Sequence, residues 1–309
     1  MQLADRLAKH LDVPLVEGLT RLSAGANMHT YAFDAVRADG SRRPLILRIE
    51  PPDLAGLADM PMEAACIAAA GEGGVPVARI VTWSADPAAL GSPFLVQERI
   101  DGETIPRRIL RGDVSGLAGQ CGELLARIHR IDPGIVPVAD PLSQSWQQYL
   151  ACDQPRAALD LGFRWLRTHP APPARREVVV HGDFRNGNLI VRDGIRAVLD
   201  WELAHRGDPL EDLGWLCVRA WRFGSPHPVG GFGSYDELFG AYERVSGEPV
   251  DREAFHWWLV FGTLRWGVMC MTMARRHTEG ATRSVELAAI GRRVCEQEYD
   301  LLMLLDGGA

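Results

Sequence analysis

The chain has 309 residues and a formal net charge of −7, from 33 basic and 40 acidic side chains. Lys9 is the only lysine, which leaves none for a P-loop and makes a Schiff-base nucleophile a poor prospect. The acidic balance argues against binding to the phosphate backbone of nucleic acids, and the length suits one large domain or two smaller ones.

The sequence also predicts a cytoplasmic protein without membrane attachment. No apolar run reaches the ~18 residues of a membrane span, because the longest candidate, 257–273, contains Arg265. The beginning of the chain, MQLADRLAKHL, is amphipathic and unlike a secretory signal. Six cysteines lie far apart without a CxxC pair, which indicates free thiols in a reducing compartment. The oligomeric state stays open.

The first hundred residues read as short strands with turns between them. The runs TYAFDAV at 30–36 and PLILRIE at 44–50 flank a polar turn and predict a hairpin of a half-buried sheet. An alanine-rich helix is expected over 62–70, stopped by GEGG. Two further strands are expected, ARIVTW at 78–83 and FLVQERI at 94–100.

Helices dominate after Asp101-Gly102, from about residue 113 onward. A compact strand–loop–strand unit interrupts them at 177–202. This change of pattern predicts a nucleotide-binding lobe over 1–100 and a helical lobe over 101–309, joined by a hinge near 97–103, with a cleft between the lobes. The expected helices span about 117–128, 146–166 (as one or two helices), 209–222, 234–246, 251–277 and 282–304.

The most informative segment is the loop 181–188, HGDFRNGN, together with VLDWE at 198–202. Short β-branched runs flank these polar residues, so Asp183, Asn188 and Asp200 are expected at strand ends. Asp183 and Asn188 are five residues apart across a loop, and a tight hairpin can return Asp200 beside Asn188. An amide oxygen and a carboxylate suit Mg²⁺ that also holds phosphate oxygens, which leaves Asp183 as a base for a hydroxyl.

This pattern, HGDxxxxN followed by hydrophobic residues and VLDWE, resembles the catalytic and metal-binding segments of the aminoglycoside phosphotransferase-like family of small-molecule kinases. GDPLEDLGW, LILRIEPP and GSPFLVQERIDGE extend the likeness through most of the chain. The resemblance implies an α+β, protein-kinase-like bilobal fold, with a small antiparallel N-terminal sheet and a larger, mainly helical C-terminal lobe. The run FGTLRWGVMCMTMARRHTEG, with LRIEPP, resembles the kinase domain fused to some acyl-CoA dehydrogenases, and this branch implies hydroxyacyl substrates.

The resemblance also implies roles for individual residues. Asp183 would be the catalytic base, and Asn188 and Asp200 would hold Mg²⁺, with ATP or GTP as phosphate donor. His181 would order the loop, and Asp212 would anchor it from a buried position. The other implied positions surround the nucleotide: Gly25 and Asn27 in the loop over its phosphates, Arg48 as the clamping cation, Glu63 as its helix partner, and Gln97, Glu98 and Ile100 at the adenine hinge.

Two departures from the family pattern leave alternatives open. Arg48 stands where such kinases usually carry lysine, and it could instead be a surface residue of an edge strand. The loop around Gly25 lacks a full GxGxxG and could be a simple hairpin loop. Glu63 could merely complement the dipole of its helix. A nucleotide-binding module with little or no catalysis is therefore an alternative, and a metal hydrolase is a weaker one, because no His/Asp ligand cluster accompanies the acids.

The helices expected on the acceptor side carry arginines. Residues 254–278 include Arg265, Arg275, Arg276 and two histidines but no acid. A polycationic aminoglycoside would require a pocket lined by carboxylates. We therefore expect an anionic or neutral small-molecule alcohol as acceptor, such as a hydroxyacyl compound. The alternatives are that these arginines only face solvent, or that the protein is an aminoglycoside phosphotransferase.

Overall fold

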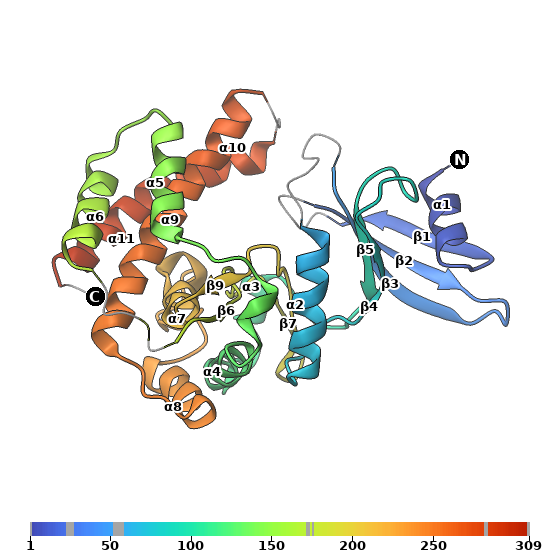
Figure 1. The fold of residues 1–309 in the computed structure, drawn as a ribbon, viewed down its shortest axis with the longest axis horizontal. Coiled ribbons are helices and arrows are strands. Elements are labelled where there is room, and N and C mark those ends of the chain that lie inside the picture. The colour runs from blue at the N-terminus through green and yellow to red at the C-terminus, as the bar shows by residue number, and fades with distance from the viewer. Residues whose placement is uncertain are drawn as a thin grey trace. The chain divides into compact units, whose positions relative to one another are not determined.

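The computed structural model describes residues 2–22, 28–51, 59–170, 174, 176–280 and 284–307. The chain divides into two compact units, drawn in Figure 1. The first unit contains Met1–Gly102 and Ile190–Ala204, and the second contains Glu103–Leu189 and His205–Ala309. The segment that follows the HGD loop therefore packs with the N-terminal residues, although it lies far from them in the sequence.

The first unit is built on a five-stranded antiparallel sheet with the strand order β1-β2-β3-β5-β4. Along β3, the buried residues Leu45, Leu47 and Ile49 alternate with more exposed ones, as expected for a half-buried strand. They pack with Phe33 and Phe94 into the core of the sheet. The elements of this unit are α1 (Leu3–His10), β1 (Leu15–Arg21), β2 (His29–Val36), β3 (Arg42–Ile49), α2 (Met60–Glu72), β4 (Ile80–Ser84), β5 (Phe94–Glu98) and β8 (Ile195–Val198).

Helix α2 is longer than the sequence predicted. The side chain of Asp59 accepts the N–H of Met62, so the helix begins at Met60, ahead of the alanine-rich run. It continues through Gly71 and ends at Glu72, and Gly73 forms the C-cap. The predicted hairpin is present as β2 and β3, in the register that pairs Phe33 with Leu45.

The second unit is mainly helical. Its helices are α3 (Pro106–Ile109), α4 (Leu117–Ile128), α5 (Pro141–Ala151), α6 (Ala157–Thr168), α7 (Leu210–Cys217), α8 (Tyr235–Ser246), α9 (Arg252–Thr278), α10 (Val285–Arg292) and α11 (Val294–Leu305), with 3-10 turns η2 (Pro133–Ile135) and η3 (Arg219–Arg222). Two short strands, β6 (Val178–Val180) and β9 (His205–Gly207), pair antiparallel. A third, β7 (Leu189–Val191), begins at the last residue of this unit's first segment and pairs with β8.

Close helix packing supports the second unit. Helices α4 and α8 pack against each other, and a Cβ at Gly122 would lie 2.3 Å from the backbone carbonyl oxygen of Leu238. Only glycine allows this approach. Two predicted single helices are divided: 209–222 into α7 and η3, and 282–304 into α10 and α11 at Arg293. The antiparallel N-terminal sheet and the mostly helical remainder confirm the predicted α+β class.

The cysteines are free thiols in this structure. Five of the six are buried, and only Cys295 is exposed. Burial raises the pKa of the Cys66 thiol to about 12. Among the helices of the described residues, none contains an apolar stretch long enough to cross a membrane.

Candidate active site

The loop 181–188 leaves a fully buried strand and is closed by its own hydrogen bonds. Strand β6 consists of three valines that pack in the core of the second unit. The Asp183 N–H donates to His181 Nδ1 at 3.2 Å, and the Asn188 N–H donates to the Arg185 carbonyl oxygen at 3.0 Å. His181, Asp183 and Asn188 are all buried. Asp183 and Asn188, two of the three residues predicted to lie at strand ends, therefore share one compact turn.

Asp212, near the start of α7, holds the backbone of this loop. Its Oδ2 accepts the His181 N–H at 2.7 Å, and its Oδ1 accepts the Gly182 N–H at 2.9 Å. Behind it, His129 Nε2 lies 3.2 Å from Oδ2, and His129 Nδ1 lies 3.0 Å from the Tyr242 hydroxyl. Burial alone would raise the pKa of Asp212, but His129, His181 and the backbone donors outweigh it and lower the pKa. Asp212 is therefore ionised and fully buried, and it braces the loop, which means that its carboxylate fixes the loop backbone at His181 and Gly182.

Three side chains hold the carboxylate of Asp183. Arg185 Nε and Trp215 Nε1 each donate to Oδ1 at 2.8 Å, and Asn188 Nδ2 donates to Oδ2 at 2.6 Å. Asn188 Nδ2 also donates to the Asp183 carbonyl oxygen at 3.0 Å. These bonds engage the amide nitrogen of Asn188, so its Oδ1 is the atom suited to bind a cation. The predicted approach of Asp183 and Asn188 is thus present.

The sequence interpretation missed Arg185 and Trp215 as partners of Asp183. Trp215 lies 32 residues after Asp183 and has an apolar ring that is typical of a core residue; the ring is buried, but the indole N–H donates to the carboxylate. Arg185 occupies one of the unspecified positions of HGDxxxxN, so the motif gave it no role. Its spacing of two residues from Asp183 in a tight loop is the signal that could have identified it.

In the first unit, Arg48 lies at the centre of a group of carboxylates. It donates to Glu63 Oε1 through Nη1 and to Asp200 Oδ1 through Nη2, the latter at 2.8 Å. Glu202 Oε2 lies 3.9 Å from the same Nη2. Burial by itself lowers the pKa of Arg48, but the three carboxylates outweigh it and raise the pKa. The side chain of Arg48 is only 11% exposed, so it is not a surface arginine. Its ion pair with Glu63 joins β3 of the sheet to α2.

The residues expected at the adenine hinge lie at the end of β5 and just after it. Gln97 is buried on β5 and pairs with Ile46 of β3. Glu98 accepts hydrogen bonds from two arginine side chains, and these bonds, with the charge of the arginines, lower its pKa. Ile100 follows β5 and is partly buried. Gly25 and Asn27, expected over the nucleotide phosphates, lie outside the described residues.

A family model described as "Phosphotransferase enzyme family" matches residues 18–252, which include Arg48, the HGD loop and Asp212. The chain belongs to this phosphotransferase family. The resemblance inferred from the motif is therefore confirmed.

Curated relatives agree with the branch inferred from the sequence. Acyl-CoA dehydrogenase family member 10 of mouse is 27% identical over 282 residues, which cover 81% of this chain and 26% of that protein. Family member 11 of mouse is 29% identical over 164 residues, covering 47% of this chain and 21% of that protein. The chain thus spans about a quarter of the length of these relatives.

Solved structures share the fold of this phosphotransferase. A Ralstonia eutropha protein assigned to the aminoglycoside phosphotransferases has a TM-score of 0.71 at 20% identity, covering 95% of both chains. A choline/ethanolamine kinase family protein from Mesorhizobium loti has a TM-score of 0.64 at 20% identity, covering 93% of this chain and 88% of that one. The GDP complex of aminoglycoside 2′-phosphotransferase-IIIa has a TM-score of 0.67 at 14% identity, covering 96% and 97%.

The two oxygen donors predicted for magnesium, Asn188 and Asp200, belong to different units of the chain. Among the described residues, no group of three or more His, Cys, Asp or Glu side chains is arranged to hold a metal ion. Asn188 belongs to the second unit and Asp200 to the first. An amide oxygen and a carboxylate are hard ligands, and Mg²⁺ commonly takes one or two protein ligands beside phosphate oxygens. The two residues therefore suit Mg²⁺ in their chemistry.

The arginines expected on the acceptor side are mostly paired. Arg265 Nη1 donates to the buried Glu211 at 3.0 Å, and Arg275 Nε lies 3.0 Å from Glu279. Arg219, on η3, lies 3.2 Å from a carboxylate oxygen of α11. The absence of acids within 254–278 therefore did not predict a free cationic surface, because the partners lie on α7, on α11 and at the residue that follows α9.

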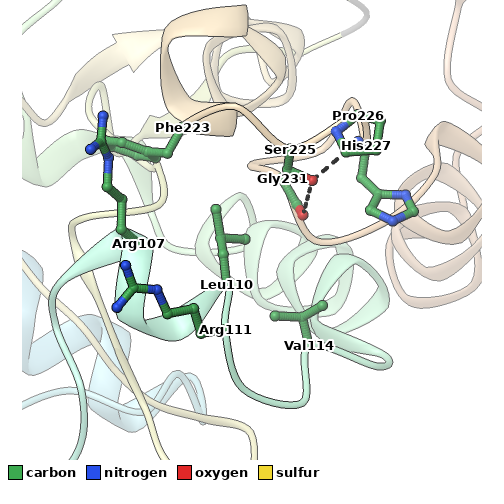
Figure 2. Close-up of a pocket in the computed structure, with 9 residues that line it drawn as sticks. All are labelled: Arg107, Leu110, Arg111, Val114, Phe223, Ser225, Pro226, His227 and Gly231. Carbon is green, nitrogen blue, oxygen red and sulfur yellow. Dashed lines mark hydrogen bonds between the residues drawn. The ribbon is translucent and has the colours of Figure 1, made fainter.

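Cavities of the second unit nevertheless carry unpaired cations. One of them has a volume of about 540 Å³. Figure 2 shows Arg107, Arg111 and Phe223 on one side of it and Ser225, Pro226 and His227 on the other. Within the described part of the chain, neither arginine side chain has an ion pair or a hydrogen bond. A neighbouring cavity of about 980 Å³ shares Arg107 and adds Arg222, whose buried Nε has no partner among the described residues. Arg222 Nη2 donates to the Cys217 carbonyl oxygen, so Arg107 and Arg111 are the cavity residues with unpaired positive charge.

Proposed function

We propose that this phosphotransferase transfers the terminal phosphoryl group of ATP or GTP to the hydroxyl of a small molecule. The HGD loop carries the proposal, because it presents a single carboxylate, Asp183, fixed by three donors on a backbone that Asp212 braces. A carboxylate held in this way can orient an alcohol and accept its proton as the oxygen attacks. Fold neighbours in complex with GDP and with ADP support a nucleotide donor without distinguishing the two.

The remaining predicted residues would serve the nucleotide. Asn188 and Asp200 would hold Mg²⁺, which neutralises charge on the phosphates when it is bound. Arg48 would contact the phosphates as a planar fork, with Glu63 holding its guanidinium, and this requires that it exchange Asp200 for phosphate oxygens. The loop residues Gly25 and Asn27 and the hinge residues Gln97, Glu98 and Ile100 would bind the rest of the nucleotide.

For the acceptor, we propose an anionic or neutral alcohol in preference to a polycation. Arg107 and Arg111 place positive charge without a side-chain partner among the described residues at the cavities of the second unit, in a chain whose net charge is −7. An aminoglycoside would meet like charge there, whereas a carboxylate or phosphate ester would be attracted. The relatives among acyl-CoA dehydrogenase family members support a hydroxyacyl compound as the first candidate.

An acceptor screen tests this assignment. ADP or GDP release is measured with each nucleotide and Mg²⁺, across hydroxylated acids, hydroxyacyl thioesters, neutral sugars and kanamycin-like amines. We expect release that depends on an anionic or neutral alcohol, together with a new phosphate ester in the ³¹P spectrum. Rapid phosphorylation of the amines without turnover of hydroxyacyl compounds would overturn the acceptor class.

A second candidate is a nucleotide-binding module with little catalysis. The hydrogen bond from Arg48 to Asp200 favours this second candidate. Arg48, proposed to contact the phosphates, is bonded here to Asp200, which is proposed to bind the metal. Thermal stabilisation by ATP and Mg²⁺ without turnover on any acceptor would support the module. Acceptor-dependent turnover would exclude it.

A further inference from the structure

We propose that Arg185 is a positioning residue that fixes the carboxylate of Asp183 for phosphoryl transfer. The proposal rests on the proposed function of Asp183 as the base. It concerns a residue to which the family motif, HGDxxxxN, gives no role. The argument begins from the surroundings of the guanidinium.

The guanidinium of Arg185 lies in a place that is shaped to receive it. Its Cζ lies 4.6 Å from the ring centroid of Trp221, which gives the cation an aromatic face. Behind it, a Cβ at Gly187 would lie 2.5 Å from Arg185 Nη1 and 3.5 Å from Pro106 Cγ. Gly187 has a φ of 123°, a conformation that favours glycine, so the loop leaves room for the guanidinium by having no side chain there.

The hydrogen bonds of Arg185 complete this arrangement. Nε is directed at Asp183 Oδ1 at 2.8 Å, and the Arg185 side chain is 25% exposed. Trp215 donates to the same oxygen, while Asn188 donates to the other. The two oxygens are thus held from different sides, and a rotation of the carboxylate would break several charge-assisted bonds at once. Lysine could supply charge here, but neither the Nε–H nor the planar group that stacks on Trp221.

Loss of this support should lower the rate of the chemical step and spare nucleotide binding. A displacement of about 1 Å in a reacting group can cost about 10²-fold in rate. We expect Arg185→Ala and Arg185→Lys to lower kcat about 10²-fold, with the KM for nucleotide within about twofold of wild type. Ethylguanidinium added to Arg185→Ala should recover kcat by about tenfold, because it can reoccupy the space beside Trp221.

Trp221 offers a matched pair of variants. Its indole Nε1 is buried and has no partner among the described residues, so Trp221→Phe removes no hydrogen bond and keeps an aromatic face. Trp221→Leu removes the face that supports the guanidinium. We expect kcat in Trp221→Leu to be about tenfold lower than in Trp221→Phe, consistent with the usual strength of a cation–π contact.

A readout that is independent of turnover separates this proposal from the proposed function. The Trp215 indole N–H donates to the oxygen that Arg185 holds, so its ¹H–¹⁵N resonance, assigned with Trp215→Phe, reports on the Asp183 carboxylate. We expect the resonance to shift in Arg185→Ala and to return with ethylguanidinium. It should stay in place in Arg244→Ala, which breaks an exposed ion pair elsewhere.

The outcomes are distinct. Full kcat in Arg185→Lys would overturn the positioning role, because charge alone would then suffice. A raised KM for the acceptor with unchanged kcat would also overturn it and make Arg185 a binding residue. If wild type phosphorylates no alcohol, the proposed function fails, and the Trp215 resonance still decides whether Arg185 holds Asp183.

Discussion

Replacement of Asp212 by asparagine should loosen the HGD loop selectively. Asp212 is fully buried, and its two oxygens accept the N–H groups of His181 and Gly182 at 2.7 and 2.9 Å. Asparagine has one acceptor oxygen, so its NH₂ group must face one of these donors. An unsatisfied buried donor costs about 1–3 kcal/mol, and the loss of charge weakens the bonds that remain, for a total of about 2–4 kcal/mol.

Amide hydrogen exchange measures this effect at the residues concerned. A loss of 2–4 kcal/mol corresponds to about 30- to 1,000-fold faster exchange at His181 and Gly182, since 1.4 kcal/mol is about a factor of ten. The exposed Asp236→Asn variant is the control and should leave both amides unchanged. If protection at the two amides in Asp212→Asn stays within about threefold of wild type, the brace has no role and the reasoning is refuted.

The same variant has a defined pH dependence. The folded-state pKa of Asp212 lies below its ordinary value of 3.8, so its contribution to stability is present above that value and is lost as the pH falls through the folded-state pKa. The stability difference between wild type and Asp212→Asn should therefore be constant near neutral pH and shrink below about pH 4. Thermal unfolding at a series of pH values measures the difference.

Other predictions concern packing, charge and thiols. Gly122→Ala places a Cβ against the backbone of α8 and should destabilise by about 2–3 kcal/mol. Gly119→Ala, one turn away with its nearest neighbour at 3.9 Å, should stabilise by about 0.5–1 kcal/mol, and thermal unfolding reads both. Glu63→Gln removes one of the carboxylates that pair with Arg48 and should lower the free energy of unfolding by about 2–4 kcal/mol. An unchanged melting temperature would contradict a stabilising role for this buried ion pair. Cys295, the exposed thiol, should react first with a thiol reagent; prior labelling of any other cysteine contradicts its burial.

Much of the fold follows from patterns that the sequence displays directly. Alternating residues in 30–36 and 44–50 predicted the β2–β3 hairpin, and apolar spacing predicted α4 and α9. The ends of helices were harder to predict. In α2, the cap at Asp59 lies outside the apolar run, and the helix continues through Gly71. The division of the C-terminal helix at Arg293 was missed, since apolar residues continue on both sides of it.

The candidate site was predictable where one loop carries it. Asp183 and Asn188 were expected to converge because they are five positions apart across a loop, and they do. The contacts of Trp215 and Arg265 were harder to predict, because their partners are distant in the sequence. Trp215 donates to Asp183, 32 positions away, and Arg265 donates to Glu211 on another helix. Tertiary pairing of this kind leaves no local pattern for sequence reasoning to detect.

The measurement that bears most directly on the central claim compares Asp183→Asn with Asp193→Asn in acceptor-dependent phosphoryl transfer. Asp193 is an exposed turn residue after the same loop, so its variant makes the same chemical change away from the site. With Asp183 as the base, Asp183→Asn should lower kcat by about 10²- to 10⁴-fold while Asp193→Asn keeps wild-type turnover. Full turnover in Asp183→Asn on a genuine acceptor would contradict the account.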